Sequence, residues 1–187
     1  LMKAAITGPS GTPYSSGCFL FDIFFPADYP ATPPLVHFLT TGQGTVRMNP
    51  NLYNNGKVCL SLLGTWSGTQ NEMWNPKRST ILSVLISIVA MIFVPEPYFN
   101  EPGYEVTRGT AAGTERSKLY NQVIREATVR HAMIGNLRDE NSEPFFRDVI
   151  RNHFHIKRDT ILADVQQWVN EAPEGKHKDR LSALLTE

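Results

Sequence analysis

Hydrophobic residues follow two different periods along this chain, and the change occurs near Ser79. Before it, apolar residues alternate with others in short segments at 2–7, 18–25 and 35–40, which Gly, Pro and Ser turns separate. After it, apolar residues recur at the helical period of 3.6. Strands followed by helices predict an α+β fold, in which a short antiparallel meander packs against helices.

Four helices are expected after the change in period. They are predicted at 79–94, at 115–137, from about Ser142 with Pro144 in the first turn, and at 159–170. The apolar run at 81–94 is shorter than the roughly 20 residues that span a bilayer, so it predicts a core helix and no membrane span. The last dozen residues are charged enough to fray.

Composition narrows the classes of function. The chain has 187 residues with 41% hydrophobic content, enough for one sizeable core. Its 18 basic and 18 acidic residues balance, which argues against nucleic acid or an acidic membrane surface as a partner. Two cysteines do not make a disulfide scaffold, and no signal peptide is visible at Leu1, so we expect the cytoplasm, with the nucleus as a second location.

One of the two cysteines stands in a pattern that suits acyl transfer. The run at 49–59 places the carboxamide of Asn51 eight residues before Cys59, with an Asn-Gly turn between them. A thiolate forms an acyl thioester readily, and a side-chain amide can stabilise the oxyanion that arises when an amine attacks it. Taken alone, the pattern equally describes a turn that leads into a core strand.

A longer set of residues resembles the ubiquitin-conjugating enzyme family. In order along the chain, the matching positions are Gly8-Pro9, Thr12-Pro13-Tyr14, Gly17, Phe19, Ile23, Phe25-Pro26, Tyr29-Pro30, Pro33-Pro34, Pro50-Asn51, Asn55-Gly56, Cys59-Leu60, Trp74-Asn75-Pro76 and 80–88. The segments NPNLYNNGKVCLSLLGTW and EPYFNEPGY are similar to those of large hybrid members, which combine conjugating and ligase activity in one very long polypeptide.

The resemblance implies a UBC-like fold with a catalytic core at 1–137 and an additional helical extension at 138–187. It implies that Cys59 receives ubiquitin from an activating enzyme and passes it to a lysine of a protein substrate. Asn51 is expected to support the oxyanion or, alternatively, to brace its own loop, and Glu101 to help deprotonate the lysine. No metal or cofactor is expected, because the activating enzyme is the partner that uses ATP.

The resemblance also implies two partner surfaces. Donor ubiquitin is expected to lie on the helix after the cysteine, over Ser83, Ile86 and Ala90, although core packing is an equal alternative for the apolar members. Ligases of the family bind two loops, which correspond here to Ala31, Asn75 and Pro76. These three residues differ from the usual aromatic residue and Ser-Pro-Ala pattern, which weakens the expectation of ordinary RING-ligase binding and leaves upstream domains of the same polypeptide as an alternative.

Several positions depart from the family pattern. Asn49 stands where most relatives have His, Ser61 where many have Asp, and an insertion at 64–73 precedes Trp74. Relatives usually carry a helix before the first strand, and none precedes Leu1 here. The histidines are expected at ordinary strand or helix positions, and Cys18 as a small core residue.

Three classes of function stay open from the sequence. The first is an active conjugating enzyme, which the presence of both Cys59 and Asn51 favours. The second is an inactive UBC-fold scaffold that binds ubiquitin or a ligase. The third is a cysteine hydrolase, which needs a histidine beside Cys59.

Overall fold

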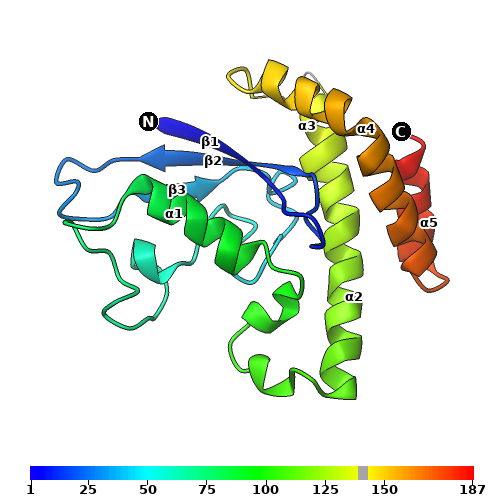
Figure 1. The fold of residues 1–187 in the computed structure, drawn as a ribbon, viewed down its shortest axis with the longest axis horizontal. Coiled ribbons are helices and arrows are strands. Elements are labelled where there is room, and N and C mark those ends of the chain that lie inside the picture. Colours follow the sequence, from blue (N-terminus) through cyan, green and yellow to red (C-terminus); the bar gives the residue numbers. More distant parts are fainter. Residues whose placement is uncertain (139–142) are drawn as a thin grey trace.

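The computed structural model describes residues 1–138 and 143–187, and its three strands form one antiparallel sheet in the order β1-β2-β3 (Figure 1). The strands are β1 at Met2–Thr7, β2 at Cys18–Phe24 and β3 at Leu35–Phe38. Lys3 pairs with Asp22, and Asp22 pairs in turn with His37. The predicted meander is confirmed, with the second and third strands one and two residues shorter than expected.

One face of the sheet forms the main core. Phe19, Phe21 and Ile23 alternate along β2 and are fully buried, as the period of two requires. Against them packs α1, at Ile81–Ser87, through Val84, and the same helix crosses the sheet in Figure 1. The predicted hydrophobic face of the second strand is therefore confirmed.

The helix over the sheet has a defined start. Thr80 is its N-cap: the Thr80 hydroxyl accepts a hydrogen bond from the Ser83 amide, and the Ser83 hydroxyl accepts one from the Thr80 amide. This reciprocal cap satisfies two backbone donors at the first turn. The helix continues as a π-helical segment at Ile88–Ile92 and ends at Phe93, so the expected helix at 79–94 is confirmed within two residues.

A long helical rod stands across the end of the sheet at which β2 begins (Figure 1). It consists of α2 at Ala111–Ala127, a π-helical segment at Thr128–Ile134 and α3 at Gly135–Leu137. It begins four residues before the predicted start, because Thr110 caps it by accepting a hydrogen bond from the Gly113 amide. Short 3₁₀ turns lie at Ser61–Leu63, Pro97–Asn100 and Glu105–Thr107.

Two further helices complete the described chain, α4 at Arg147–Glu171 and α5 at Lys176–Leu185. The prediction of two separate helices here is wrong, because α4 is a single helix of 25 residues. Residues 155–160 are all exposed and carry no apolar period, yet the helix continues through them because its segments on both sides are buried in one cluster. Pro144 lies in the preceding turn, and Ser142 lies outside the described residues.

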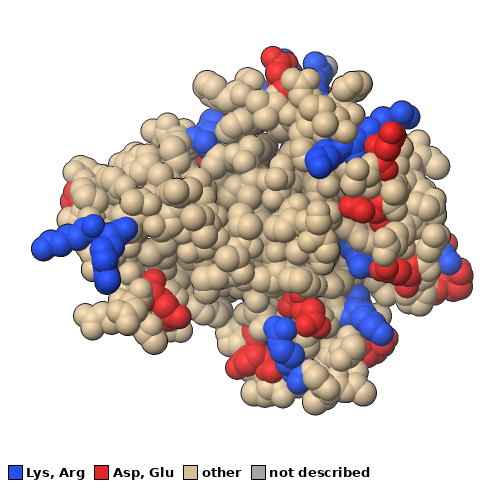
Figure 2. Space-filling model, in the orientation of Figure 1, with Lys and Arg blue, Asp and Glu red and all other residues tan. Residues whose placement is uncertain are grey.

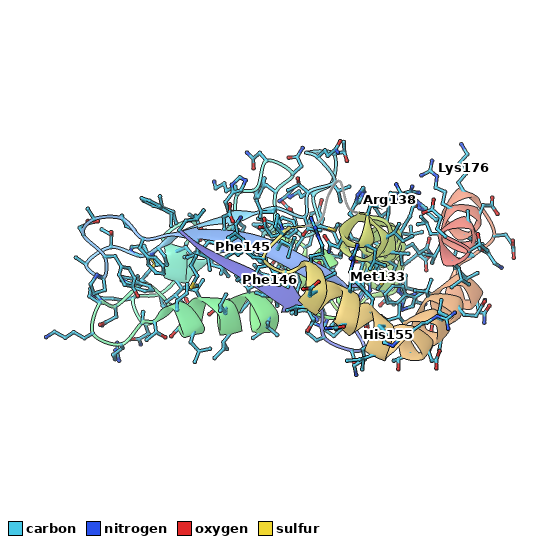
Figure 3. The ribbon with its side chains drawn as sticks, turned by 90° about the horizontal axis from the view of Figure 1, so that it is seen from above. Met133, Arg138, Phe145, Phe146, His155 and Lys176 are labelled. Carbon is cyan, nitrogen blue, oxygen red and sulfur yellow. The ribbon has the colours of Figure 1, made fainter. Side chains whose placement is uncertain are left out.

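The expected fraying of the last dozen residues is also wrong. Leu181 and Leu184 are buried, and they anchor α5 against α4 and the helical rod. Figure 3 views this arrangement from above, with Met133 on the rod, Phe146 before α4 and Lys176 at the start of α5. The charged side chains on the outer face of α5 led to the expectation of fraying, although its apolar residues form a buried stripe.

The helices at the end of the chain cover part of the second face of the sheet. Cys18 and Leu20 point to that face and are buried with Val129, Met133 and residues of α4. The prediction that Cys18 is a small core residue is confirmed. Further along β2 the same face becomes half-buried, where Asp22 accepts a hydrogen bond from Lys3 Nζ over 2.8 Å.

Candidate active site

Asn51 and Cys59 lie opposite each other across a tight turn. The Cys59 amide donates to the Asn51 carbonyl over 2.9 Å, and Asn51 Nδ2 donates to the Cys59 carbonyl over 2.8 Å. Gly56 makes the turn possible, since it has φ of +85° and a Cβ there would lie 2.1 Å from the His37 ring. The structure therefore brings together the two residues that the sequence placed eight positions apart.

A buried carboxamide at Asn49 holds this turn against the core. Asn49 Nδ2 donates to Tyr14 Oη over 2.9 Å and to the Ile92 carbonyl over 2.8 Å. Asn49 Oδ1 accepts from the Asn51 amide over 2.8 Å and from Asn100 Nδ2 over 3.3 Å. Because an amide has two donors and one acceptor oxygen with two lone pairs, all its capacity is used. This explains how Asn serves where most relatives have His.

Burial raises the pKa of the Cys59 thiol by more than nearby positive charge lowers it. Cys59 is buried, and desolvation raises the pKa of its thiol. Lys57 and Arg47 act in the opposite direction and lower that pKa. Among the described residues no hydrogen bond joins Cys59 Sγ to a histidine, so the geometry gives no support to a Cys-His pair.

Arg47 is a site residue that the sequence reading missed. Its Nη2 donates to the Pro50 carbonyl over 2.6 Å and to Glu101 Oε2 over 3.2 Å, and its guanidinium stacks 4.2 Å from the Tyr53 ring centroid. No motif spacing marks this arginine, because its partner Glu101 lies 54 residues away and only the fold joins them.

Glu101 follows the 3₁₀ turn at Pro97–Asn100, on the rim of a pocket of about 470 Å³. The other lining residues are Arg47, Pro50, Tyr98, Tyr104 and Tyr120. Burial raises the pKa of the Tyr120 phenol well above its usual range, so this tyrosine stays a neutral hydrogen-bonding group. The structure thus connects Glu101 to the cysteine loop through Arg47.

Thr65 folds the chain after Cys59 back onto the residues beside the cysteine through hydrogen bonds of its hydroxyl. Its hydroxyl donates to the Val58 carbonyl over 2.6 Å and accepts from the Leu60 amide over 3.0 Å. Ser61, which replaces the Asp of many relatives, donates to the Ser67 carbonyl over 3.2 Å. These bonds give the insertion at 64–73 a fixed path next to the cysteine.

The two predicted ligase-facing loops meet in space. Trp74 Nε1 donates to the Pro30 carbonyl over 2.8 Å, and the Trp74 ring lies 5.8 Å from the Tyr29 ring. Ala31 and Pro76 are exposed at this contact, and Asn75 Oδ1 accepts a hydrogen bond from the Lys77 amide. Ala31 and Pro76 are therefore accessible, whereas the Asn75 side chain is used within its own turn.

The predicted donor surface lies on the outer side of α1 and the π-helical segment after it. Ile86 is 57% exposed and Ala90 is exposed, so neither is a core residue, while Ser83 is engaged in the helix cap. No charged residue occurs at 79–95, and Figure 2 shows the centre of this face free of charged side chains. Charged side chains lie around it, at the left end, at the lower edge and over the helices at the end of the chain.

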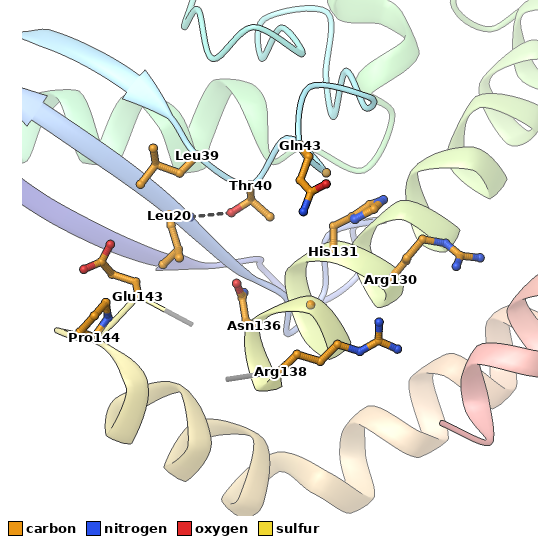
Figure 4. Close-up of a pocket in the computed structure, with 12 residues that line it drawn as sticks. Leu20, Leu39, Thr40, Gln43, Arg130, His131, Asn136, Arg138, Glu143 and Pro144 are labelled. Carbon is orange, nitrogen blue, oxygen red and sulfur yellow. Dashed lines mark hydrogen bonds between the residues drawn. The ribbon is translucent and has the colours of Figure 1, made fainter. Parts of the chain in front are cut away.

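A second pocket, of about 500 Å³, lies away from Cys59 (Figure 4). It is bordered by Leu20 near the start of β2, by the turn that carries Gln43, by His131 of the helical rod and by Arg138, which directly follows the rod. Within 1–138 and 143–187, no group of three His, Cys, Asp or Glu side chains could hold a metal ion. No helix in that same part of the chain is long and apolar enough to cross a bilayer.

Comparison with known proteins gives a consistent result. A sequence model described as "Ubiquitin-conjugating enzyme" matches residues 1–128. The human protein "Dual E2 ubiquitin-conjugating enzyme/E3 ubiquitin-protein ligase BIRC6" is 50% identical over 186 residues, which are 100% of this chain and 4% of that protein. This similarity confirms the predicted resemblance to the large hybrid members of the BRUCE (Apollon) type, to which BIRC6 belongs.

Two further matches extend the comparison. "Probable ubiquitin-conjugating enzyme protein 17" of Caenorhabditis elegans is 48% identical over 182 residues, covering 97% of this chain and 25% of that protein. A solved structure, a Toxoplasma gondii ubiquitin-conjugating enzyme E2 domain, aligns with a TM-score of 0.51 at 33% identity and covers 70% of this chain and 79% of that one. The chain thus spans a quarter or less of the length of these two sequence relatives.

Proposed function

The chain belongs to the ubiquitin-conjugating enzyme family, and from that premise we propose that it is an active conjugating enzyme. Cys59 accepts ubiquitin from an activating enzyme as a thioester and transfers it to a lysine of a protein substrate. The observation that carries this proposal is the pair of hydrogen bonds between Asn51 and the Cys59 backbone, because it holds a side-chain amide against the residue that carries the thiol.

The transfer step follows from the groups around Cys59. The amine nitrogen attacks the thioester carbonyl, the C–S bond breaks, and Cys59 leaves as a thiolate. Asn51 donates to the oxyanion of the tetrahedral intermediate, and Glu101 receives the surplus proton of the amine. Lys57 and Arg47 favour the departing thiolate, since both lower the pKa of Cys59.

The partners are proposed on the same basis. Donor ubiquitin lies on the uncharged outer face of α1 and the π-helical segment after it, around Ile86 and Ala90, both of which are exposed. A ligase, or upstream domains of the same polypeptide, contacts the joined loops at Ala31 and Pro76. We also propose that the helices at 143–187 form an extension of the catalytic core, because they bury Cys18 and Leu20 of its sheet.

The test is thioester formation. The chain is incubated with activating enzyme, ATP and ubiquitin, and a non-reducing gel is examined for a higher-mass band that thiol removes. The proposal expects this band with wild type and with Cys18→Ala, and its loss with Cys59→Ala. Absence of the band from wild type, also in a chain extended upstream, would favour the alternative of an inactive UBC-fold scaffold.

A further inference from the structure

Arg47 joins the turn before Cys59 to the segment that follows α1. Its Nη2 contacts the Pro50 carbonyl and the Glu101 carboxylate at 2.6 and 3.2 Å, and its guanidinium covers the Tyr53 ring at 4.2 Å. These partners come from the turn before the cysteine and from the segment after α1. A planar guanidinium can make these contacts together, which the single ammonium of a lysine cannot do with the same geometry.

The contact with Pro50 bears on Asn51. Pro50 directly precedes Asn51, so its carbonyl belongs to the peptide unit that carries the Asn51 amide. That amide donates to Asn49 Oδ1, and the Asn51 side chain donates to the Cys59 carbonyl. Arg47 therefore fixes one end of the peptide whose other end orients the proposed oxyanion donor.

The contact with Glu101 bears on the proton acceptor. The Arg47 and Glu101 side chains are 38% and 35% exposed, and a partly exposed ion pair of this kind contributes little to folding. Its effect is on orientation: it holds the carboxylate at the pocket that Tyr98, Tyr104 and Tyr120 line. The Glu101 carboxylate therefore has a fixed position, from which it would accept the proton of an incoming amine.

We propose that Arg47 is a positioning residue for ubiquitin transfer. It fixes the positions of Asn51 and Glu101 relative to Cys59. The inference rests on the proposed function and names a residue that the family resemblance did not supply. Arg47 forms no bond with the reacting atoms. It acts by keeping two groups, from segments 50 residues apart in sequence, in one arrangement.

The experiment measures single-turnover discharge of ubiquitin from Cys59 to free lysine. Arg47→Gln is expected to leave the extent of charging unchanged and to slow discharge on the order of tenfold to a hundredfold, because small misplacements of reacting groups have effects of this size. Arg47→Lys keeps the charge but loses the planar contacts, so it is expected to restore only part of the rate.

A matched control is present in the same region. Arg108 also pairs with a glutamate, Glu96, over 3.0 Å, and it stacks 4.4 Å from the Phe99 ring centroid. Arg108→Gln therefore removes an arginine with the same kinds of contact, although a more exposed one, without touching Pro50 or Glu101. Discharge is expected to proceed at the wild-type rate in this variant.

The double variant Arg47→Gln/Glu101→Gln separates positioning from other roles. If Arg47 acts through Glu101 and Asn51, the double variant discharges about as slowly as the slower single variant, because groups that act as a unit are not additive. Full multiplication of the two effects, or a wild-type rate for Arg47→Gln, would overturn the proposal.

Alkylation of Cys59 by iodoacetamide measures a separate effect, that of the Arg47 charge on the thiol. The charged groups that act on the thiol are Lys57 and Arg47, so Arg47→Gln is expected to move the pH profile of alkylation upward, whereas Arg108→Gln leaves it in place. A wild-type protein that forms no thioester contradicts the proposed function. In a wild-type protein that does charge, an Arg47→Gln variant that discharges at the wild-type rate contradicts the role of Arg47.

Discussion

The Asn51 side chain and the Cys59 backbone carbonyl are joined by a hydrogen bond of 2.8 Å. This bond supports the reading of Asn51 as a brace for its loop. The amide nitrogen carries two hydrogens, however, so one can remain on the Cys59 carbonyl while the other is offered to an oxyanion. Bracing and oxyanion support are therefore compatible roles of one side chain.

Asn51→Ala separates the two roles. Charging is expected to remain largely intact, while discharge to lysine slows on the order of a hundredfold or more, since one oxyanion donor contributes roughly 2.7–4 kcal/mol to the barrier. The measurement is single-turnover discharge, with Asn54→Ala as the control, because Asn54 lies in the same turn and bonds the Gly44 carbonyl. Equal loss of charging and discharge would make Asn51 a brace only.

Glu101→Ala tests the proposed proton acceptor. Free lysine has a pKa near 10.4, so it is mostly protonated at neutral pH and most dependent on a nearby carboxylate there. Discharge is expected to fall most near pH 7 and to recover as the pH rises toward 10. Glu96→Ala is the control, since Glu96 pairs with Arg108 outside the pocket. A rate that does not change at any pH would remove Glu101 from the site.

The sequence predicted those parts of the fold and site that depend on local pattern. Strand alternation located Phe19, Phe21 and Ile23 in the core, and the Asn-Gly turn brought Asn51 to Cys59. What it missed depends on contacts between distant segments. The continuity of α4 through its exposed residues comes from the cluster that it shares with β2 and the helical rod, and the order of α5 comes from packing on α4 and the rod. The pairing of Arg47 with Glu101 has no local signature.

Asn49 links the catalytic turn to the core, so its removal is expected to affect stability. Asn49→Ala leaves Tyr14 Oη, the Ile92 carbonyl and the Asn51 amide without this partner, and unsatisfied buried groups cost about 1–3 kcal/mol each. We expect a loss of several kcal/mol by urea unfolding. Asn49→His, which introduces the residue expected in most relatives, is predicted to lower the free energy of unfolding by less. Equal losses in the two variants would mean that these polar contacts do not contribute to stability.

The extension is predicted to unfold together with the core. Trp168 on α4 is 7% exposed and belongs to the cluster that buries Cys18 and Leu20. Trp168→Ala is expected to lower the free energy of unfolding by about 3–5 kcal/mol in a single transition. Ile156→Ala on the same helix, 76% exposed, is the control and is expected to change little. Two separate transitions in wild type would instead describe an independent extension.

Cys18 is expected to make the folded protein less stable as the pH becomes alkaline. Burial raises the pKa of its thiol from 9.0 to about 12, so between these values the unfolded chain releases a proton that the folded chain retains. Stability is therefore lost as pH rises above 9, by about 1.4 kcal/mol per pH unit and about 3 kcal/mol at pH 11. Cys18→Ala removes this loss, although at pH 7 it costs about 1 kcal/mol through lost packing. Under reducing conditions, urea unfolding at pH 7 and pH 11 is thus expected to show the variant less stable than wild type at the first pH and more stable at the second. A difference that stays constant with pH would mean that the Cys18 thiol ionises as easily in the folded protein as in the unfolded chain.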